Sequence, residues 1–376
     1  MPATIAGTVS KTVTTLSDGR RLIYFDEVDI AGRIRRRGGL TDTRHLEPAT
    51  SAAQLRYDVL TGEWVTIAAQ RMNRTFLPAR DASPLAPTRP GSPPTEIPAA
   101  DYDVVVFENR FPALSPRAVA TAPVIDGEPL WPQAPGRGGC EVVCFTSDPD
   151  ACFADLSPRR VRTVIEAWAD RTAELSATPG VQQIFCFENR GREIGVTLTH
   201  PHGQIYAYPF QPPRTRALIA QARTHAAATG GDLFADVLAA ERRSGRRILV
   251  AGEHWTAFVP AAARWPLEIH LMPHRDIPDF CALSGAERGE LAAVYLQLLQ
   301  RVDRFFEGVD QTPYIAAWHQ APLGADRPFG RLHLQLFSLM RSPGRMKYLA
   351  GSESAVGAWV NDTTPERIAD RLREVA

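Results

Sequence analysis

The chain has 376 residues, of which 44% are hydrophobic, enough for one large or two ordinary domains with a buried core. Lysine plus arginine and aspartate plus glutamate number 42 each, so net charge gives no bias towards nucleic acid or membrane surfaces. The five cysteines form no C-x-x-C pair, which argues against a disulfide framework or a standard zinc finger. We find no signal peptide and no apolar run that could span a bilayer, and we expect a soluble, cytoplasmic protein.

Apolar periodicity predicts strands and helices along the chain. The expected strands are residues 21–25, 61–68, 103–107, 140–145, 181–187, 247–251, 254–259, 267–271, 314–319 and 332–337. The expected helices are residues 158–175, 213–228, 232–243, 285–306 and 364–375, and Ser157, Ser284 and Thr363 or Thr364 cap the first, fourth and fifth of them. Residues 78–98 are dense in proline and predict an irregular connector, and residues 188–191 predict a loop after a strand.

The most informative stretch is residues 195–208, which contain two histidines and a glutamine at alternate positions. Alternate side chains of a strand share one face. The residues expected on that face are His200, His202, Gln204, Tyr206 and Tyr208. Because buried polar groups need partners, a plain core strand would not carry this set, which indicates a site for a metal, a phosphoryl group or a leaving oxygen. Gly203 is expected to leave room for a ligand beside His202. The alternative is a pair of surface histidines on an edge strand.

His200-Pro201-His202-Gly203-Gln204 resembles the active-site signature of the galactose-1-phosphate uridylyltransferases, the transferase branch of the histidine-triad superfamily. The resemblance extends from about Arg56 to Glu353. It implies an α+β, duplicated histidine-triad-like fold, with two halves that each have an antiparallel sheet flanked by helices. The implied division is an N-terminal extension (1–50), a first domain with the nucleophile (51–212) and a second domain (213–376). Leu332-His333-Leu334-Gln335 resembles a decayed copy of the motif, as a duplication would leave.

The resemblance also implies roles for individual residues. His202 would be the nucleophile, Gln204 would donate a hydrogen bond to a phosphoryl oxygen, and His200 would orient His202 or its backbone. The residues implied to bind substrate are Arg71, Arg74, Phe107, Asn109, Asn189, Gly195, Thr197, Lys347 and Glu353. Without the resemblance, Phe107 and Asn109 are equally consistent with a core phenylalanine and a turn asparagine. Trp359 stands near the position of a glutamine in the family, which leaves the identity of the hexose open.

Zinc is typical of the family, but most of its ligands are missing here. Ser83, Ala86 and Pro149 occupy three of the four ligand positions, and only His200 is retained. No metal is therefore assigned. A replacement site with Cys144 or Cys152, an aspartate and His200 is the alternative, since thiolate and imidazole suit zinc.

A second metal site of the family uses C-terminal histidines. His319 and His333 match two of them, and Gln335 replaces the third. Two imidazoles alone rarely hold a structural metal. We expect this site to be empty, with both histidines satisfied as polar residues between strands.

The implied function is a UDP-glucose:hexose-1-phosphate uridylyltransferase of galactose catabolism. It would act by ping-pong chemistry through a uridylyl-histidine and convert galactose 1-phosphate to UDP-galactose. The implied partners are these two substrates and a second copy of the chain, with no nucleic acid and no membrane. The first alternative is a related nucleotidyltransferase or dinucleotide phosphorylase with a different nucleotide or acceptor. The second alternative is a catalytically idle nucleotide-sugar binder or a metal-binding scaffold.

Overall fold

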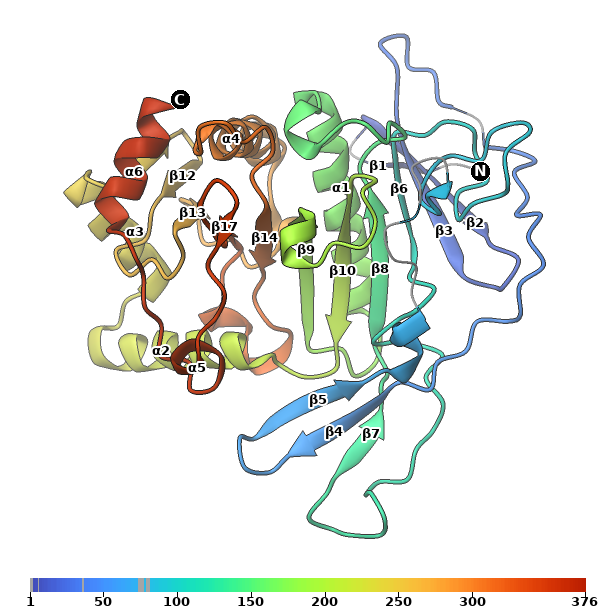
Figure 1. Ribbon diagram of the computed structural model, residues 1–376, viewed down its shortest axis with the longest axis horizontal. Helices are drawn as coiled ribbons and strands as arrows, with labels where there is room; N and C mark the ends of the chain where they lie inside the picture. The colour runs from blue at the N-terminus through green and yellow to red at the C-terminus, as the bar shows by residue number, and fades with distance from the viewer. Residues whose placement is uncertain (1–2, 6, 36, 74–77, 79–81) are drawn as a thin grey trace.

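The computed structural model describes residues 3–5, 7–35, 37–73, 78 and 82–376. Within these residues one continuous antiparallel sheet of twelve strands crosses the molecule (Figure 1). Its strands are, in spatial order, β1 (Ala3–Ile5), β2 (Val9–Thr15), β3 (Arg21–Glu27), β6 (Val104–Glu108), β8 (Gly139–Cys144), β10 (His202–Tyr208), β9 (Gln183–Arg190), β14 (Tyr314–His319), β15 (His333–Ser338), β13 (Leu267–Pro273), β12 (Trp255–Phe258) and β11 (Ile248–Ala251). The expected α+β class is confirmed.

Helices and two small sheets complete the fold. The helices are α1 (Pro158–Ser176), α2 (Pro213–Thr229), α3 (Leu233–Ser244), α4 (Gly285–Arg304), α5 (Gly351–Ser354) and α6 (Pro365–Glu374). The small sheets are β5 (Glu63–Ile67), β4 (Gln54–Asp58) and β7 (Gln133–Pro135), and β16 (Met340–Ser342) with β17 (Arg345–Met346). Short 3₁₀ turns are η1 (Ala69–Asn73), η3 (Phe153–Asp155), η4 (Arg192–Ile194), η5 (Phe280–Ala282) and η6 (Gly324–Phe329).

The two long helices begin where their capping residues predict. The Ser157 hydroxyl accepts a hydrogen bond from the backbone N–H of Arg160, and Pro158 follows at the first helical position of α1. Ser284 and Glu287 form a reciprocal capping box at the start of α4. Thr364 caps α6 as Ser157 caps α1, because its side chain accepts a hydrogen bond from the backbone N–H of Arg367.

The order of the elements repeats about the pairing of β9 with β14. In the first half β8, α1, β9 and β10 follow one another, and in the second half β13, α4, β14 and β15 do the same. The spatial orders β8-β10-β9 and β14-β15-β13 mirror each other across this pair. The registers place one row of paired residues across the sheet: Phe107, Val142, Gln204, Phe187, Ala317, Gln335, His270 and Phe258. Gln335 is therefore the counterpart of Gln204, as the decayed motif indicated.

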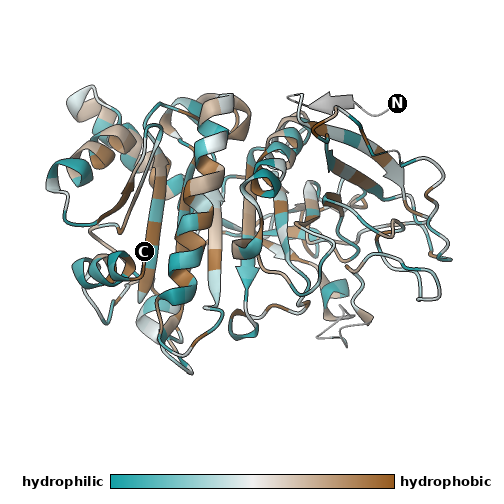
Figure 2. Cartoon of the chain, turned by 90° about the horizontal axis from the view of Figure 1, so that it is seen from above, coloured by the Kyte–Doolittle hydropathy of each residue, from teal (hydrophilic) through white to brown (hydrophobic). Residues whose placement is uncertain are grey.

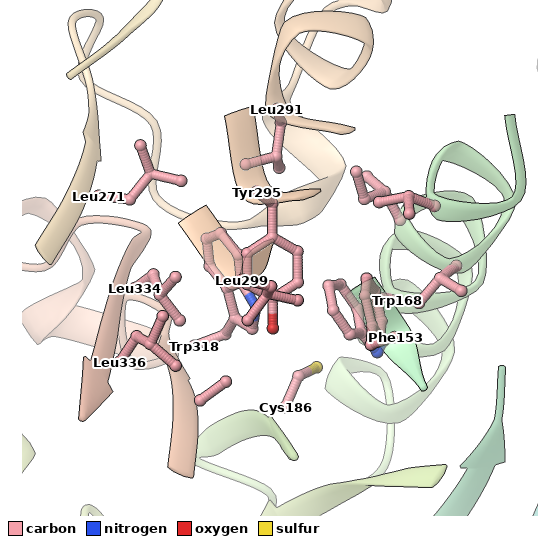
Figure 3. Packing of buried hydrophobic residues seen from close by; sticks show 14 of the residues in the cluster. Phe153, Trp168, Cys186, Leu271, Leu291, Tyr295, Leu299, Trp318, Leu334 and Leu336 are labelled. Carbon is pink, nitrogen blue, oxygen red and sulfur yellow. The ribbon is translucent and has the colours of Figure 1, made fainter. Parts of the chain in front are cut away.

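Both halves share one hydrophobic core beneath the sheet. Trp318 of β14 lies 5.5 Å from Tyr295 of α4 and 6.0 Å from Trp168 of α1, measured between ring centroids. Figure 3 shows these rings together with Phe153 and Cys186 of the first half. Figure 2 shows hydrophobic residues along the strands, while the helices that lie over them mix hydrophobic and hydrophilic positions. The halves therefore fold against each other rather than as separate bodies.

The structure differs from the expected elements in several places, since β4, β7, β16, β17 and α5 were not among those expected. Residues 188–190 were expected in a loop, but Glu188, Asn189 and Arg190 continue β9, because β14 of the other half pairs with them. Near the N-terminus periodicity missed β1 and β2, which extend the sheet of the first half beyond the expected strand β3. The expected domain boundaries after residues 50 and 212 stay predictions. In the described part of the chain no helix combines the length and the hydrophobicity that a membrane crossing needs.

Replacement of Trp318 should test the shared core. Its side chain is 1% exposed, and truncation of a buried tryptophan costs about 3–5 kcal/mol. We expect Trp318→Ala to lower the free energy of unfolding by that amount in denaturant titrations followed by circular dichroism. Trp131→Ala is the matched control, because Trp131 is 47% exposed. An equal loss in both variants would contradict a core that joins the halves.

Candidate active site

Strand β10 presents to one cavity three of the five side chains expected on a common face, whereas Tyr208 lines a different cavity and His200 precedes the strand. His202, Gln204 and Tyr206 line this cavity, and Gly203 and Ile205 are buried on the opposite face. The reason expected for Gly203 is wrong. A Cβ at this position would lie 2.7 Å from Cζ of Phe145, so the glycine allows close packing behind the strand rather than access for a ligand. His200 lies just before the strand, and its ring is buried outside the cavity lining.

The cavity has a volume of about 250 Å³ and collects most of the residues singled out from the sequence. The expected site residues that line it are Arg71, Phe107, Asn109, Asn189, Gly195, Thr197, His202 and Gln204. They come from η1, from β6 and the turn after it, from β9, from the loop before β10 and from β10 itself. Gly195 has a φ of +82°, a left-handed conformation that glycine adopts readily, in the loop that carries Thr197 to the cavity.

The ring of His202 is held in one tautomer. Its Nδ1 lies 2.8 Å from the backbone carbonyl of His200. Because a carbonyl only accepts, Nδ1 carries the hydrogen and Nε2 keeps its lone pair. Burial lowers the pKa of His202 below its ordinary value, partly offset by this hydrogen bond. A neutral imidazole with a free Nε2 can act as a nucleophile at neutral pH.

The charges around the cavity favour an anionic ligand. Arg71 and Arg110 both line it, and Arg71 also donates to the carbonyl of Phe111. Glu96 lines it too, but its carboxylate is paired with Arg20 at 2.6 Å and with Arg44 at 2.9 Å. Arg110 itself lies 3.9 Å from Glu96, but with Arg20 and Arg44 also on that carboxylate the guanidinium groups outnumber it and favour phosphate oxygens.

Apolar side chains form another part of the cavity wall. Leu85 and Val142 join Phe107 there, and Phe187 and Tyr206 lie 5.2 Å apart between ring centroids. A flat base can pack against such a surface. Sequence reasoning missed Arg110, Leu85 and Phe187. Of these, Phe187 was recoverable, because it alternates with Asn189 on β9 and so shares its face.

The residues around His200 do not offer the ligands of a structural zinc, although its buried Nδ1 has no hydrogen-bond partner among the described residues. Its Nε2 lies 2.9 Å from the carbonyl of Thr146 and 2.8 Å from the hydroxyl of Tyr102. The Ser83 hydroxyl accepts from the N–H of Leu85, and alanine and proline at the two other positions offer no side-chain ligand. Among the described residues no three histidine, cysteine, aspartate or glutamate side chains are grouped to hold a metal ion.

The alternative zinc site is not supported either. Burial raises the pKa of the Cys144 thiol well above its ordinary value and that of Cys152 to about 11. Among the described residues neither thiol is grouped with His200 and an aspartate in a way that could hold a metal ion.

In the second half, hydrogen bonds engage His333, the counterpart of His202. His333 Nδ1 contacts the carbonyl of Arg331 at 2.9 Å, and its Nε2 lies 3.1 Å from the amide nitrogen of Gln335. Arg214 donates to the amide oxygen of Gln335 at 2.9 Å. His319 stacks on His333 with 4.9 Å between the ring centroids. Both nitrogens of His333 are thus engaged, and a guanidinium lies beside them, so these residues do not fit a metal ion.

Two of the expected binding residues lie elsewhere. Lys347 and Glu353 form a buried ion pair at 2.8 Å, and neither lines the cavity. Lys347 also donates to the carbonyl of Arg264 in the second half. Figure 1 shows α5, which contains Glu353, below the second half and away from β8 and β10. Arg74 lies outside the described residues.

Comparisons with known proteins agree with this geometry. The family profile described as "Galactose-1-phosphate uridyl transferase, N-terminal domain" matches residues 43–212, and the profile of the C-terminal domain matches residues 219–376. A galactose-1-phosphate uridylyltransferase of Streptomyces lividans is 45% identical over 376 residues and covers 98% of both chains. A galactose-1-phosphate uridylyltransferase of Thermotoga maritima is 33% identical over 85% of this chain and 98% of its own.

A solved structure agrees as well. A structure titled "Structure of uridylyltransferase" superposes with a TM-score of 0.75 at 30% identity and covers 86% of this chain and 98% of its own. The chain thus belongs to the galactose-1-phosphate uridylyltransferase family of transferases.

Proposed function

We propose that the chain transfers a uridylyl group from UDP-glucose to galactose 1-phosphate through a covalent intermediate on His202. The observation that carries this proposal is the fixed tautomer of His202: Nδ1 is bound to the His200 carbonyl, and Nε2 belongs to a cavity that also contains Gln204 and Arg71. The names of the relatives support the choice of substrates. The five free cysteines agree with a reducing compartment, and we place the reaction in the cytoplasm, in galactose catabolism.

The first half-reaction forms the intermediate. Nε2 of His202 attacks the α-phosphorus of UDP-glucose, the bond to the glucose 1-phosphate oxygen breaks, and glucose 1-phosphate leaves with the bonding electron pair. Arg71 is positioned to bind phosphate oxygens, and Phe107, Leu85 and Val142 offer the uracil ring an apolar surface. Gln204 donates an amide hydrogen to a phosphoryl oxygen and so stabilises the charge that develops there.

The second half-reaction regenerates the histidine. A phosphate oxygen of galactose 1-phosphate attacks the same phosphorus, and the P–N bond to Nε2 breaks to give UDP-galactose. Gln204 has no basic group that could activate water, which protects the intermediate from hydrolysis until the sugar phosphate arrives. Since one ring serves both steps, the kinetics are ping-pong.

Replacement of His202 should abolish the intermediate. Wild-type protein incubated with UDP-glucose and no acceptor is expected to gain the mass of one uridylyl group in intact-mass measurements. His202→Gln should form it at least about a thousandfold more slowly, because no other group replaces the nucleophile. The matched control is His333→Gln, the counterpart in the second half, which should form the adduct at the wild-type rate.

The same assay separates the alternatives. An adduct from ADP-glucose or diadenosine tetraphosphate, but not from UDP-glucose, would favour a related nucleotidyltransferase or phosphorylase. Donor binding without any adduct in the wild type would favour an idle nucleotide-sugar binder and contradict the proposal.

We also propose that the chain works as a homodimer. Lys347 and Glu353, proposed to bind the hexose phosphate, do not line the cavity of their own chain. Exposed apolar side chains flank them, with Tyr348 at 80% and Val356 at 76% exposure. A second apolar surface lies on the β4–β5 hairpin, where Leu60 is 94% exposed and Val65 48% exposed. A second copy could cover these surfaces and bring the 345–357 segment to the cavity of its partner.

The dimer can be tested by mass in solution. We expect twice 41.3 kDa by light scattering and a shift towards 41.3 kDa for Leu60→Glu with Val65→Glu, because two charges would be buried in the interface. Val13→Glu is the control, since Val13 is 48% exposed on β2. A monomeric wild type at the concentrations of full activity would refute the dimer.

A further inference from the structure

Tyr102 connects the irregular connector to the residue that holds the nucleophile. Its side chain is 1% exposed, and its hydroxyl donates to the carbonyl of Leu85 at 3.3 Å. The same oxygen lies 2.8 Å from Nε2 of His200. Because Nε2 also contacts the carbonyl of Thr146, which can only accept, Nε2 carries the hydrogen and shares it between the two oxygens. The hydrogen bonds are thus consistent in direction from His200 to Tyr102 to Leu85.

These contacts join the three segments that carry the zinc-ligand positions of the family. Leu85 lies between Ser83 and Ala86, and Thr146 lies three residues before Pro149. His200 is the retained position, and its own carbonyl accepts from Nδ1 of His202. A metal at this place would cross-link the same segments, but these residues do not fit one. The phenol of Tyr102 provides a cross-link without a metal.

We infer that Tyr102 positions the nucleophile in place of a structural metal, by fixing His200, whose carbonyl fixes the ring of His202. Burial of this network supports the role: His200 is 1% exposed, and Cys144, whose thiol lies beside the hydroxyl of Tyr102, is fully buried. Loss of the hydroxyl would leave the Thr146 carbonyl as the remaining partner of Nε2, loosen the His200 ring and shift the carbonyl that sets the tautomer and angle of His202. A small displacement of a reacting group can cost as much as about a hundredfold in rate.

The test compares Tyr102→Phe with Tyr24→Phe. Tyr24 lies in the same buried cluster as Tyr102 and Leu85, and it has no contact with His200 in the described hydrogen bonds. The adduct on His202 is measured in single turnovers over a range of UDP-glucose concentrations. We expect Tyr102→Phe to lower the rate at saturating donor about tenfold and to change donor affinity less than about twofold. Tyr24→Phe should keep the wild-type rate even if its melting temperature falls.

The inference rests on the proposed function, because the measured reaction is uridylyl transfer. Different results would refute the proposed function and the positioning role of Tyr102. Absence of the adduct in the wild type refutes the proposed function. If Tyr102→Phe forms the adduct as fast as the wild type does, the positioning role is refuted. An equal loss of rate in Tyr102→Phe and Tyr24→Phe refutes it as well.

Zinc content of the native protein provides a second measurement that does not depend on whether Tyr102→Phe folds. We expect elemental analysis to find no stoichiometric zinc and dialysis against a chelator to leave the adduct rate unchanged. One zinc per chain, whose removal abolishes the adduct and whose return restores it, would overturn the inference.

Discussion

The pairing of β9 with β14 is the constraint on which the rest of the structure depends. It joins the sheets of the two halves at the centre of the molecule and continues through Asn189, which pairs with Ile315. On the helix face below, Tyr314 donates to Glu188, whose carboxyl has its pKa raised to about 7 by burial. Arg190 pairs there with Asp303 of α4 and lies over the ring of Tyr314. The end of β9 that lines the cavity is thus fixed by the other half of the chain.

The motif histidines of the two halves differ because different segments cover them, although a cavity of about 340 Å³ lined by His319 and Gln335 also opens in the second half. In the second half Phe234 and Leu238 of α3 pack on Phe258, the counterpart of Phe107, and Phe234 also lies 5.4 Å from His333 between ring centroids. In the first half the connector and the loop before β10 take this place and leave the cavity. His333 keeps the geometry of His202, with Nδ1 on the carbonyl two residues earlier, but its Nε2 meets Gln335 instead of open space. The two halves therefore differ in what covers the histidine, and not in whether the histidine is present.

Local signals accounted for the elements and the site residues that sequence could predict. The caps at Ser157 and Ser284 and the alternation of β10 depend on neighbours within a few residues, and periodicity detects them. The extension of β9 through Arg190 was missed because its partner strand lies more than a hundred residues away. No local sequence pattern identifies Tyr102. It is a single tyrosine before a buried strand, and its contact with His200 exists only in the folded chain.

The charge of the cavity also depends on contacts between residues that are far apart in the sequence. Glu96 comes from the connector that also supplies Leu85, and alone it would repel a phosphate. Arg20, at the start of β3, and Arg44 both reach its carboxylate, and Arg20 is itself 1% exposed. With Arg20 and Arg44 on the Glu96 carboxylate, and Arg110 3.9 Å from it, positive charge prevails where a ligand meets Arg71 and Arg110. Residues of the first fifty therefore contribute to the site without lining it, because Arg20 and Arg44 pair with the carboxylate that would oppose a phosphate there.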